Sequence, residues 1–353
     1  MQLKDLPIGS LVKDPNSLFL GQPIIWKIAD KNYTGYPDNS ITLISDKVIA
    51  ERVYDAKEII DPMVYSWGDG RYSVSNIRQW LNSDAEPGEW YTPQHKDDFP
   101  PNEETCNQRP YINDAGFLNA FSNNFKKALL NTTLYLEERD WDEESSETIT
   151  TSVTIEDKIF LANHIEVGLS IENMPAPMSL TDEPSAIPFQ IFTDDTSRIA
   201  YYTNEAAEDD NNDWGVEGGA AHDWALRTQH PTTNSMVIDV LSNGAVSGIE
   251  AFGENGIRPL CNLDASTTIS DEPDTDGCYI LTFIPDVKGF LNEKGLGLLL
   301  NRMKEYVDNV EIILKAYTEE YVNNKFWIGT QEEYDALTEK NGQTIYLIKD
   351  EEV

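Results

Sequence analysis

The chain has 353 residues and a formal net charge of −36, with 62 Asp and Glu against 26 Lys and Arg. This charge argues against a nucleic-acid-binding protein, because phosphate contacts need clusters of Lys and Arg, and against docking on anionic membranes. Apolar residues make up 40% of the chain, which allows a real core in two or three domains. The acidic surface is either simply solvated or recruits divalent cations.

Cysteine usage and the distribution of apolar residues indicate the compartment. Cys106, Cys261 and Cys278 form no CxxC pair, and an odd count does not indicate a disulfide framework, so a reducing compartment of synthesis is expected. No apolar run reaches the length of about 18 residues that a transmembrane helix needs. The N-terminal residues lack the apolar segment of a secretory signal. We expect a protein that stays in the cytoplasm in which it is made or leaves it by cell lysis, as a virion protein does, without membrane insertion.

The first half of the chain predicts strands followed by two short helical regions. Residues 9–13, 23–29 and 40–45 have the composition and alternation of strands. Residues 73–82 predict a helix capped by Ser75, since Ile77, Trp80 and Leu81 fall on one face. A long polar loop follows over residues 82–115. Residues 117–130 predict a second helical region, whose second half Ser122 caps.

The middle of the chain combines acidic segments with strands. Residues 137–147 are expected to form an acidic turn or flap, and residues 148–154 and 157–161 to form strands. Residues 174–188 contain four prolines and predict an extended loop. A second acidic run follows at residues 205–213.

Two arginine-bearing motifs close this part of the chain. Trp-Ala-Leu-Arg at residues 224–227 and Gly-Ile-Arg-Pro-Leu at residues 256–260 predict strands that flank a hairpin with a Ser-Asn-Gly turn. Because an arginine within a strand is costly to bury alone, we expect Arg227 and Arg258 to join loops to the sheet through carboxylates or carbonyls. The alternative is that both side chains lie on the solvent face.

Together with earlier blocks in the same order, these motifs resemble a domain family of tailed-phage structural proteins and some bacterial surface proteins. The resemblance covers roughly residues 1–265 and implies a C-type-lectin-like α+β fold, distantly related to formylglycine-generating enzymes. It assigns Trp224, Arg227 and Arg258 a structural role. The chain departs from the family at Ala225 and in the acidic insert before Trp224. The other blocks are residues 5–13, 23–29, 75–82, 117–122 and 157–161.

The C-terminal part has a different pattern. Residues 266–288 are expected to be a connecting β segment. Residues 289–324 carry apolar residues at alternating steps of three and four, which indicates an oligomerising, coiled-coil-like helix in a dimer or a trimer. A single amphipathic helix packed on its own domain is the alternative. The positions of this register are Leu296, Leu299, Met303, Tyr306, Val310, Ile313 and Tyr317.

Residues 325–353 predict a small βαβ module. A strand is followed by a helix with a capping box, Thr330 and Glu333, and by a second strand after an Asn-Gly turn. The pattern Trp-Ile-Gly-Thr-Gln at residues 327–331 with Thr-Ile-Tyr-Leu-Ile at 344–348 is similar to a module of phage tail, baseplate and fibre proteins.

The search for chemistry gives no catalytic residue. The histidines lack a nucleophile-elbow partner such as GxSxG, and the paired active-site cysteines of formylglycine-generating enzymes have no counterpart here. No cofactor is expected, apart from a possible Ca²⁺. Asp209, Asn211 and Asp213 have the first spacings of a calcium loop, although Trp214 replaces its glycine. A second, weaker candidate set is Asp271, Asp274 and Asp276.

Aromatic residues in the long loops could stack on sugars, or could instead pack down to order those loops. The candidate residues for such contacts are Trp90, Tyr91, Trp141, Tyr201, Tyr202 and Trp214. We expect a non-enzymatic virion surface protein, such as a tail or head fibre or a receptor-binding protein. Its partners would be itself, other virion proteins and a host-surface glycan or protein. The alternatives are a decoration protein without a ligand and a glycan-degrading enzyme.

Overall fold

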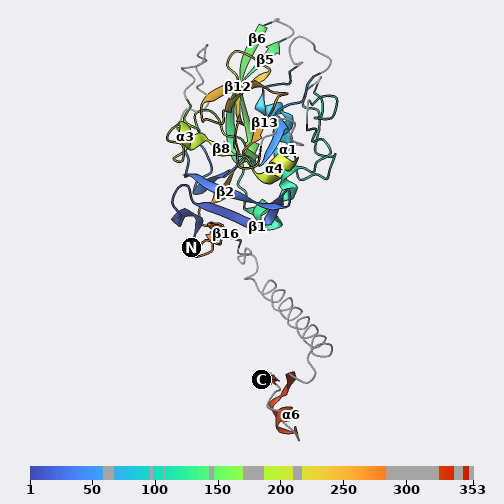
Figure 1. The fold of residues 1–353 in the computed structure, drawn as a ribbon, viewed down its shortest axis with the longest axis vertical. Helices are drawn as coiled ribbons and strands as arrows, with labels where there is room; N and C mark the ends of the chain where they lie inside the picture. The colour runs from blue at the N-terminus through green and yellow to red at the C-terminus, as the bar shows by residue number, and fades with distance from the viewer. Residues whose placement is uncertain are drawn as a thin grey trace. The chain divides into compact units, whose positions relative to one another are not determined.

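The computed structural model describes residues 1–58, 67–95, 98–106, 109–142, 147–169, 187–209, 217–283, 326–337 and 345–349. At residues 141, 142, 326–328 and 345–349 it describes the backbone alone. The chain divides into two compact units, Met1–Phe283 and Ile284–Val353, which we call the head and the C-terminal unit (Figure 1). The helix predicted over residues 289–324 lies outside the described residues.

The larger sheet of the head has seven strands among the described residues, and β16 pairs in parallel with β1. The head therefore extends through Phe283, and residues 268–282 belong to its sheet instead of forming a connector after residue 265. The strand order is β15 (Thr268–Ile269), β16 (Cys278–Thr282), β1 (Leu11–Phe19), β2 (Gln22–Lys31), β3 (Ser40–Ser45), β14 (Leu260–Asp264) and β7 (Ile159–Phe160).

Strand β3 shows why this sheet lies inside the head. All six of its residues are buried, including the polar ones, so both of its faces are covered. Thr42 donates a hydrogen bond to Asn262 Oδ1 at 2.7 Å, and the amide of Asn262 donates to Thr132 Oγ1 at 2.9 Å. These bonds remove the cost of burying the polar face of an alternating strand.

The second sheet has five strands within the described ranges, and the predicted hairpin is its β11–β12 pair. The sequence predicts that Arg258 lies within a strand, but the structure places it between two strands. It stands between β13 and β14, where Arg258 and Pro259 carry the chain from the second sheet to the first. Because Pro259 has no N–H to give to a ladder, it suits this crossing. The strand order is β12 (Val246–Glu250), β11 (Met236–Val240), β10 (Trp224–Gln229), β13 (Glu254–Ile257) and β4 (Ala50–Val53).

A long hairpin stands apart from both sheets. Strands β5 (Thr132–Asp142) and β6 (Glu147–Asp157) pair in register over their whole length. Residues 137–142, predicted as an acidic turn or flap, are therefore strand. Two of their charges have partners in the head: the buried Glu138 accepts from Ser73 N at 2.8 Å, and Asp140 pairs with Arg71. A shorter pair, β8 (Ala200–Tyr201) with β9 (Ala221–His222), completes the strands of the head.

The two predicted helical regions are present, and serine caps define both. Ser75 Oγ accepts from the N–H of Arg78 at 3.4 Å at the start of α1 (Asn76–Leu81), and Ser122 Oγ accepts from Phe125 N at 3.1 Å at the start of α2 (Asn123–Ala128). Ser122 has extended backbone angles, so it separates α2 from the short 3₁₀ turn η3 (Phe117–Ala120). The other helical turns are η1 (Leu3–Asp5), η2 (Tyr72–Val74), α3 (Asp195–Arg198) and α4 (Asn204–Asp209).

Aromatic side chains fill the space between the sheet and these helices. Trp26 of β2 stacks on Phe121 and Phe125, with ring centroids 6.2 and 6.0 Å apart, while Trp80 of α1 packs against Phe117 at 5.0 Å. Fully burying each such ring contributes about 2–3 kcal/mol. The head is a mixed α/β unit made mostly of sheet. No helix in the described ranges has the length and apolar content needed to cross a bilayer.

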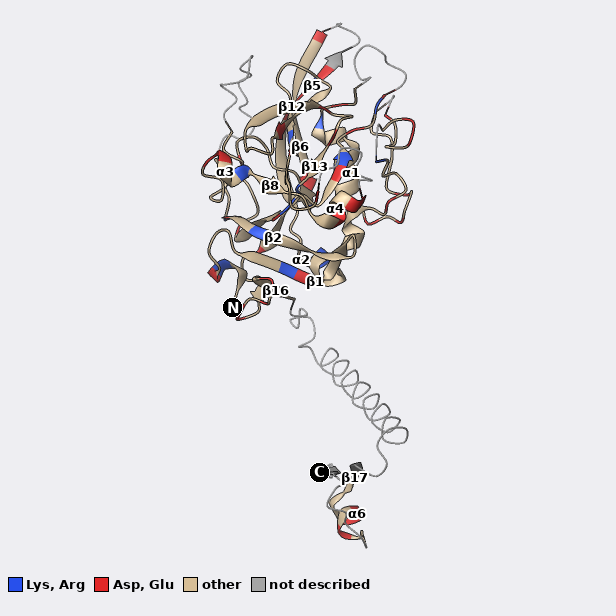
Figure 2. Cartoon of the chain, in the orientation of Figure 1, with Lys and Arg blue, Asp and Glu red and all other residues tan. Residues whose placement is uncertain are grey.

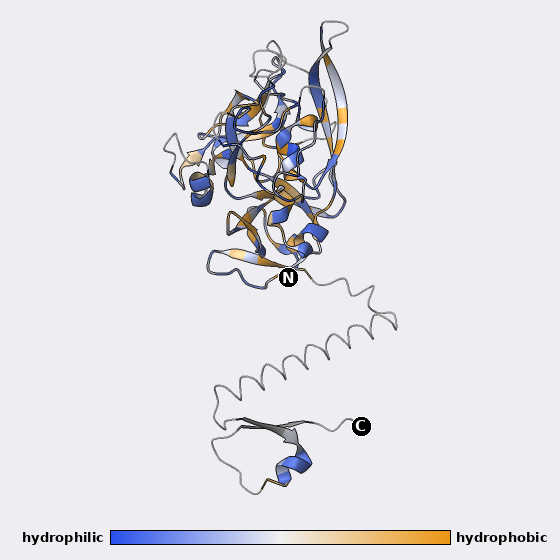
Figure 3. Cartoon of the chain, turned by 90° about the vertical axis from the view of Figure 1, so that its right-hand side faces the viewer, coloured by the Kyte–Doolittle hydropathy of each residue, from blue (hydrophilic) through white to orange (hydrophobic). Residues whose placement is uncertain are grey.

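The C-terminal unit contains the predicted βαβ arrangement. Strands β17 (Phe326–Thr330) and β18 (Ile345–Lys349) pair in parallel, with α6 (Gln331–Asp335) between them in the chain. The capping box forms as expected: Thr330 Oγ1 accepts from Glu333 N at 3.2 Å, and Glu333 Oε2 accepts from Thr330 N at 2.9 Å. Helix α6 has no buried residue and is coloured hydrophilic in Figure 3.

A buried ion pair joins the two sheets of the head. Arg227 of β10 donates to both carboxylate oxygens of Glu166 at 2.7 Å, and neither side chain is exposed to solvent. Arg227 also donates to the carbonyl of Leu161 at 2.7 Å, and its own N–H donates to Ala162 O at 2.8 Å. Glu166 lies in the loop that follows β7, so this pair fixes that loop of the first sheet onto the second.

We expect Glu166→Gln to lower the free energy of unfolding of the head by about 3–5 kcal/mol, because it leaves the buried Arg227 charge without its counter-ion. Chemical denaturation of the full chain measures this. Asp271→Asn is the matched control, since it removes a carboxylate whose side chain is 88% exposed, and exposed pairs contribute little. Equal, small effects of the two substitutions would contradict a stabilising role for the buried pair.

Candidate functional site

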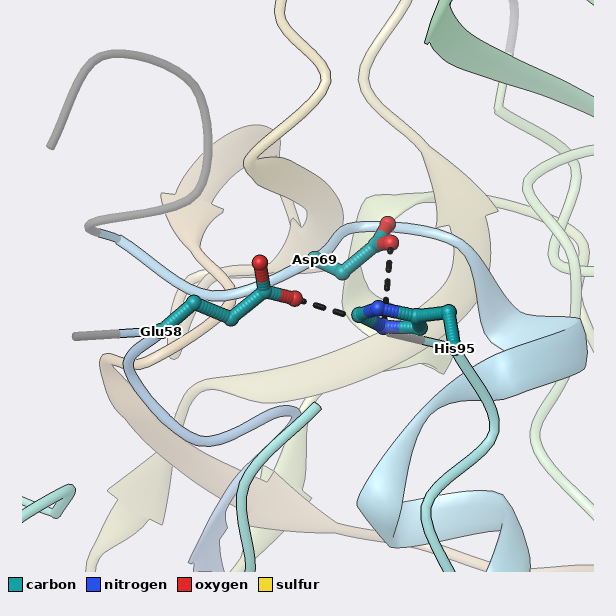
Figure 4. A group of neighbouring side chains, drawn as sticks. All are labelled: Glu58, Asp69 and His95. Carbon is teal, nitrogen blue, oxygen red and sulfur yellow. Dashed lines mark ion pairs between the residues drawn. The ribbon is translucent and has the colours of Figure 1, made fainter. Parts of the chain in front are cut away.

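Three loops of the head bring Glu58, Asp69 and His95 together (Figure 4). His95 Nε2 lies 3.3 Å from Glu58 Oε1 and 3.8 Å from Asp69 Oδ2. Glu58 and Asp69 are buried, whereas the side chain of His95 is 21% exposed. We call these three residues the Glu–Asp–His cluster. It offers two carboxylates and one imidazole at a point that solvent reaches from the histidine side.

Backbone crowding fixes the position of Asp69. Gly68 has φ +79°, and a Cβ there would lie 2.7 Å from the carbonyl oxygen of Asp55. A Cβ at Gly70 would lie 2.5 Å from the carbonyl oxygen of Met236. Only glycine fits at both positions, so the Gly-Asp-Gly segment passes tightly between neighbouring backbones and holds the carboxylate in one place.

Arg71 orients the Asp69 carboxylate. Its Nε lies 2.8 Å from Asp69 Oδ2, and its backbone N–H donates to Asp69 Oδ1 at 2.8 Å. The N–H of Asp69 itself donates to Asp55 Oδ2 at 2.9 Å. A ligating carboxylate held by such outer bonds has little freedom to turn away.

Glu58 reaches the cluster from the segment that leaves β4. Lys57 is exposed and its N–H donates to Thr105 O at 3.0 Å, while the next side chain, Glu58, turns inward and is 1% exposed. Neither oxygen of Glu58 accepts a hydrogen bond from any described residue. A buried carboxylate without hydrogen bonds is costly, so the ionised form needs a cation nearby.

The loop that carries His95 is held by Asp98. Asp98 Oδ2 accepts from the N–H of Gln94 at 2.7 Å, and the Tyr91 hydroxyl donates to the carbonyl of Asp98 at 2.9 Å. Asn76, at the start of α1, donates to Asp98 Oδ1 at 3.3 Å and to Asp55 Oδ1 through its backbone N–H at 2.9 Å. The buried residue Asn76 thus links Asp98, which anchors the loop of His95, to Asp55, which accepts from the backbone of Asp69.

Burial and neighbouring carboxylates disfavour the ionised form of the carboxyl groups at and around the cluster. Burial, followed by the charges of Asp55, Asp69 and Asp98, raises the pKa of Glu58 to about 10. Burial likewise raises the pKa of Asp55 well above its ordinary range, although two backbone N–H groups bind its oxygens. Without a cation, Glu58 therefore carries a proton at neutral pH. The cluster can therefore either keep this proton on Glu58 or bind a metal cation between its three side chains.

Reasoning from the sequence missed this cluster and placed His95 on a surface loop. Its ligand atoms come from residues 58, 69 and 95, which share no short spacing of the kind that marks a metal motif. The Gly-Asp-Gly segment at residues 68–70 signals a tight backbone path, but nothing in it shows that Asp69 faces Glu58. Among the described residues, these three form the group of His, Cys, Asp or Glu side chains whose ligand atoms lie close enough together to hold a metal ion.

The predicted calcium residue Asp209 has arginine partners instead. Asp209 Oδ2 accepts from Arg52 Nη2 at 2.8 Å and Oδ1 from Arg109 Nη2 at 3.0 Å, while Asp114 contacts both guanidinium groups. Burial opposes ionisation, yet the two arginines lower the pKa of Asp209 below its ordinary value. Its carboxylate is thus already neutralised. Asn211 and Asp213 lie outside the described residues.

The second set of predicted calcium ligands, Asp271, Asp274 and Asp276, is paired with amino groups of the protein. Lys13 Nζ lies 2.8 Å from Asp274 Oδ2 and 2.6 Å from Asp276 Oδ2, and the N-terminal amine lies 2.9 Å from Asp271 Oδ1. These carboxylates tie the first and last strands of the head together. Figure 2 shows further acidic residues on α3, on α4 and along several loops of the head.

Most of the described aromatic candidates pack down instead of facing solvent. Trp90 is 5% exposed and stacks on Tyr111 at 5.3 Å with an interplanar angle of 8°. Tyr91 is half-buried and bonded to Asp98, as described above. Tyr202 is 1% exposed, and its hydroxyl donates to Glu51 and to the carbonyl of Ala206. The buried rings of Trp90 and Tyr202 are not available to stack on a sugar.

Tyr201 is the exception, with 49% of its surface exposed. The side chain of Trp141 and the whole of Trp214 lie outside what the structure describes. The structure therefore does not bring the six aromatic candidates together in one surface site.

Trp224 and Arg258 form part of the structural frame. The indole N–H of Trp224 donates to the carbonyl of Arg198 at 3.1 Å, and the guanidinium of Arg258 lies 5.0 Å from the centre of the Trp224 ring. Arg258 Nε donates to the carbonyl of Ser45 at 3.0 Å, and burial lowers the pKa of Arg258 to about 10. Both Arg227 and Arg258 are buried, so neither lies on the solvent face.

The other titratable candidates have structural surroundings. His222 Nε2 lies 3.3 Å from Glu51, and its Nδ1 contacts the carbonyl of Asp223 at 2.8 Å. His164 is buried beside Arg227, and burial lowers its pKa to about 3. The three cysteines are free and buried.

Comparison with known families adds two findings to this geometry. A model of the phage tail tip domain matches residues 324–349, which include β17, α6 and β18, and supports a phage-tail-related protein. A model described as a domain of unknown function (DUF6273) matches residues 39–265, and the chain belongs to that family. No curated protein and no solved structure matches the chain.

We expect Asp209→Asn to lower the free energy of unfolding at pH 7 by about 1–3 kcal/mol, because it removes the negative charge and one of the two acceptor oxygens that face the guanidinium groups of Arg52 and Arg109. The folded-state pKa of Asp209 is below the unfolded value of about 3.9, so its stabilisation is present above that pH and disappears as pH falls through the folded pKa. The difference from the wild type should therefore shrink below about pH 4. Denaturation curves between pH 3 and pH 7 measure it.

Asp38→Asn is the control for the Asp209 experiment, because Asp38 is exposed and its loss changes the net charge by the same amount. A loss of stability at Asp209 that matches the control, or that grows as the pH falls, would contradict the assigned pairing.

Proposed function

We propose that this protein is a phage tail component whose head attaches to the host surface by binding rather than by turnover. The observation that carries the proposal is the combination, in one chain, of a match to the phage tail tip domain at residues 324–349 and a separate compact head of 283 residues. A small tail module needs no such head to join a particle. The head is therefore the part available for another partner.

The contact surface that we assign is the solvent-exposed part of the β5–β6 hairpin, which comprises β6 from Glu147 onward and Tyr135 of β5. Residues 147–152 of β6 are exposed in six consecutive positions, although alternate side chains of a strand point to opposite faces. The distal part of β6 is thus open to solvent, whereas the paired residues of β5 contact the head: Glu138 is buried and Asp140 pairs with Arg71. The end of the hairpin projects from the head (Figure 1). Tyr135 and Ile149 are large apolar side chains of the hairpin that are 45% and 44% exposed.

The chemistry of the hairpin fits a polar polymer. Thr148, Thr150, Thr151, Ser152 and Thr154 offer hydroxyl donors and acceptors along one strand, and Tyr135 offers an aromatic face. With a net charge of −36, the protein would be repelled by strongly anionic surface polymers. We therefore propose a neutral or cationic glycan or protein as the receptor.

The resemblance noted in the sequence extends this proposal to architecture. A C-type-lectin-like head would suit a ligand-binding role, because such folds present loops from a rigid frame. The a/d register of residues 289–324 supports assembly of the chain with itself, and other virion proteins would be the partners of the C-terminal unit.

We predict that labelled full-length protein binds saturably to some members of a panel of intact bacteria. Tyr135→Ala combined with Ile149→Ala should weaken this binding at least tenfold, since anchor side chains carry most of an interface's affinity. Flow cytometry as a function of protein concentration measures both effects.

The matched control for the hairpin is Ile187→Ala combined with Tyr201→Ala, which removes the same side-chain types from exposed positions elsewhere on the head. Loss of binding with the control pair alone would assign attachment to another surface. Absence of binding to every member of the panel would instead favour a decoration protein without a ligand.

We also predict that the full chain is a dimer or a trimer in solution. Leu299→Asp with Ile313→Asp should convert it to a monomer, because both residues occupy a/d positions of the predicted register, where charge disrupts packing. Light scattering after size exclusion gives the mass. A monomeric wild type would overturn the oligomer proposal but leave attachment open.

A further inference from the structure

We propose that the Glu–Asp–His cluster binds a divalent transition-metal ion of the zinc class, with Glu58, Asp69 and His95 as its protein ligands. This site is independent of the attachment proposed above, since none of its residues belongs to the β5–β6 hairpin. The donor atoms of the three residues all lie within 4.8 Å of one another.

The distances match what one ion would impose. Zinc lies about 2.0–2.2 Å from imidazole nitrogen and carboxylate oxygen, so neighbouring ligand atoms of a tetrahedral site are roughly 3.3–3.6 Å apart. The observed separations from His95 Nε2 are 3.3 Å to Glu58 and 3.8 Å to Asp69. Small movements of side chains would bring all three within coordination distance.

Glu58 provides an independent reason to expect a ligand. Its carboxyl group is 1% exposed, faces His95, and receives no hydrogen bond from the described residues. Buried polar groups in folded proteins nearly always have partners, and an orphaned carboxyl marks a position where an unseen group belongs. A bound cation would occupy the space that both Glu58 oxygens leave without a donor.

The donor set selects the class of metal. Imidazole suits zinc and its transition-metal neighbours, whereas calcium takes six to eight oxygen ligands and magnesium keeps most of its waters. One nitrogen and two oxygens from buried side chains fit zinc with a fourth position for water. The partial exposure of His95 leaves an entry path for the ion.

Bonds behind the ligands support the same assignment. Arg71 holds the Asp69 carboxylate, and Asp98 anchors the loop that carries His95. The ion would therefore join three segments of the head that lie up to 37 positions apart (95 − 58). Its consequence would be stability of these loops, because an ion that binds only the folded state shifts the folding equilibrium towards it.

The test uses full-length protein freed of metal by a chelator and then dialysed. Titration with ZnCl₂, followed by calorimetry and by elemental analysis after gel filtration, should give one tightly bound ion per chain. A hundredfold excess of CaCl₂ should not displace it. Cobalt(II) added in place of zinc should give the visible absorption bands of a four-coordinate site.

Glu58→Gln and His95→Gln should each weaken zinc binding at least tenfold and abolish the cobalt spectrum. His230→Gln is the matched control, because His230 is a histidine outside the cluster whose ring contacts Thr232. It should leave the binding unchanged.

Thermal unfolding separates loss of the site from loss of the fold. With chelator present, Glu58→Gln should unfold at the same or a higher temperature than the wild type, because a neutral amide replaces a buried carboxyl group. With zinc present, the order should reverse. The proposal is overturned if no ion binds, if calcium displaces zinc, or if binding survives both substitutions in the cluster.

Discussion

The bidentate pair between Arg227 and Glu166 is the interaction on which the head depends. It lies where the loop after β7 of the larger sheet meets β10 of the smaller one, and both side chains are fully buried. A charge in such a place is tolerated only with a well-aligned counter-ion. Two sheets with separate hydrogen-bond ladders are thereby joined through side chains. Arg258 joins them a second time, at the point where the chain itself crosses from one sheet to the other.

Several arginines of this acidic chain are used inside the head. Arg52, Arg227 and Arg258 are each at most 2% exposed, and each is matched to carboxylates, carbonyls or aromatic rings. Lys13 is clamped by two aspartates. The buried carboxyl groups around Glu58 differ, because Arg71 bonds to Asp69 while neither oxygen of Glu58 accepts a hydrogen bond from a described residue. This local shortage of positive charge is the physical basis of the proposed metal site.

The proposed function divides along the same line as the two units of the chain. The C-terminal unit carries the match to the phage tail tip domain, and its helix α6 begins with a complete capping box. The head has an interior of two sheets and an aromatic core, from which one long hairpin projects with the distal part of β6 exposed. A stiff frame with an exposed extension is a suitable arrangement for contact with a surface, because little ordering is required when the partner binds.

The sequence by itself determined the local elements, because their causes are local. Serine caps at Ser75 and Ser122, the hairpin turn at residues 242–244 and the capping box at Thr330 depend on neighbours within a few residues, and all are present. The need of Arg227 for a partner could also be predicted, since burial of a charge always requires one. Only the tertiary structure decided that this partner is Glu166, that Asp209 serves two arginines, and that Trp90 and Tyr202 are buried. It alone brought together Glu58, Asp69 and His95, because contacts between distant loops follow from how two sheets pack and leave no spacing in the chain.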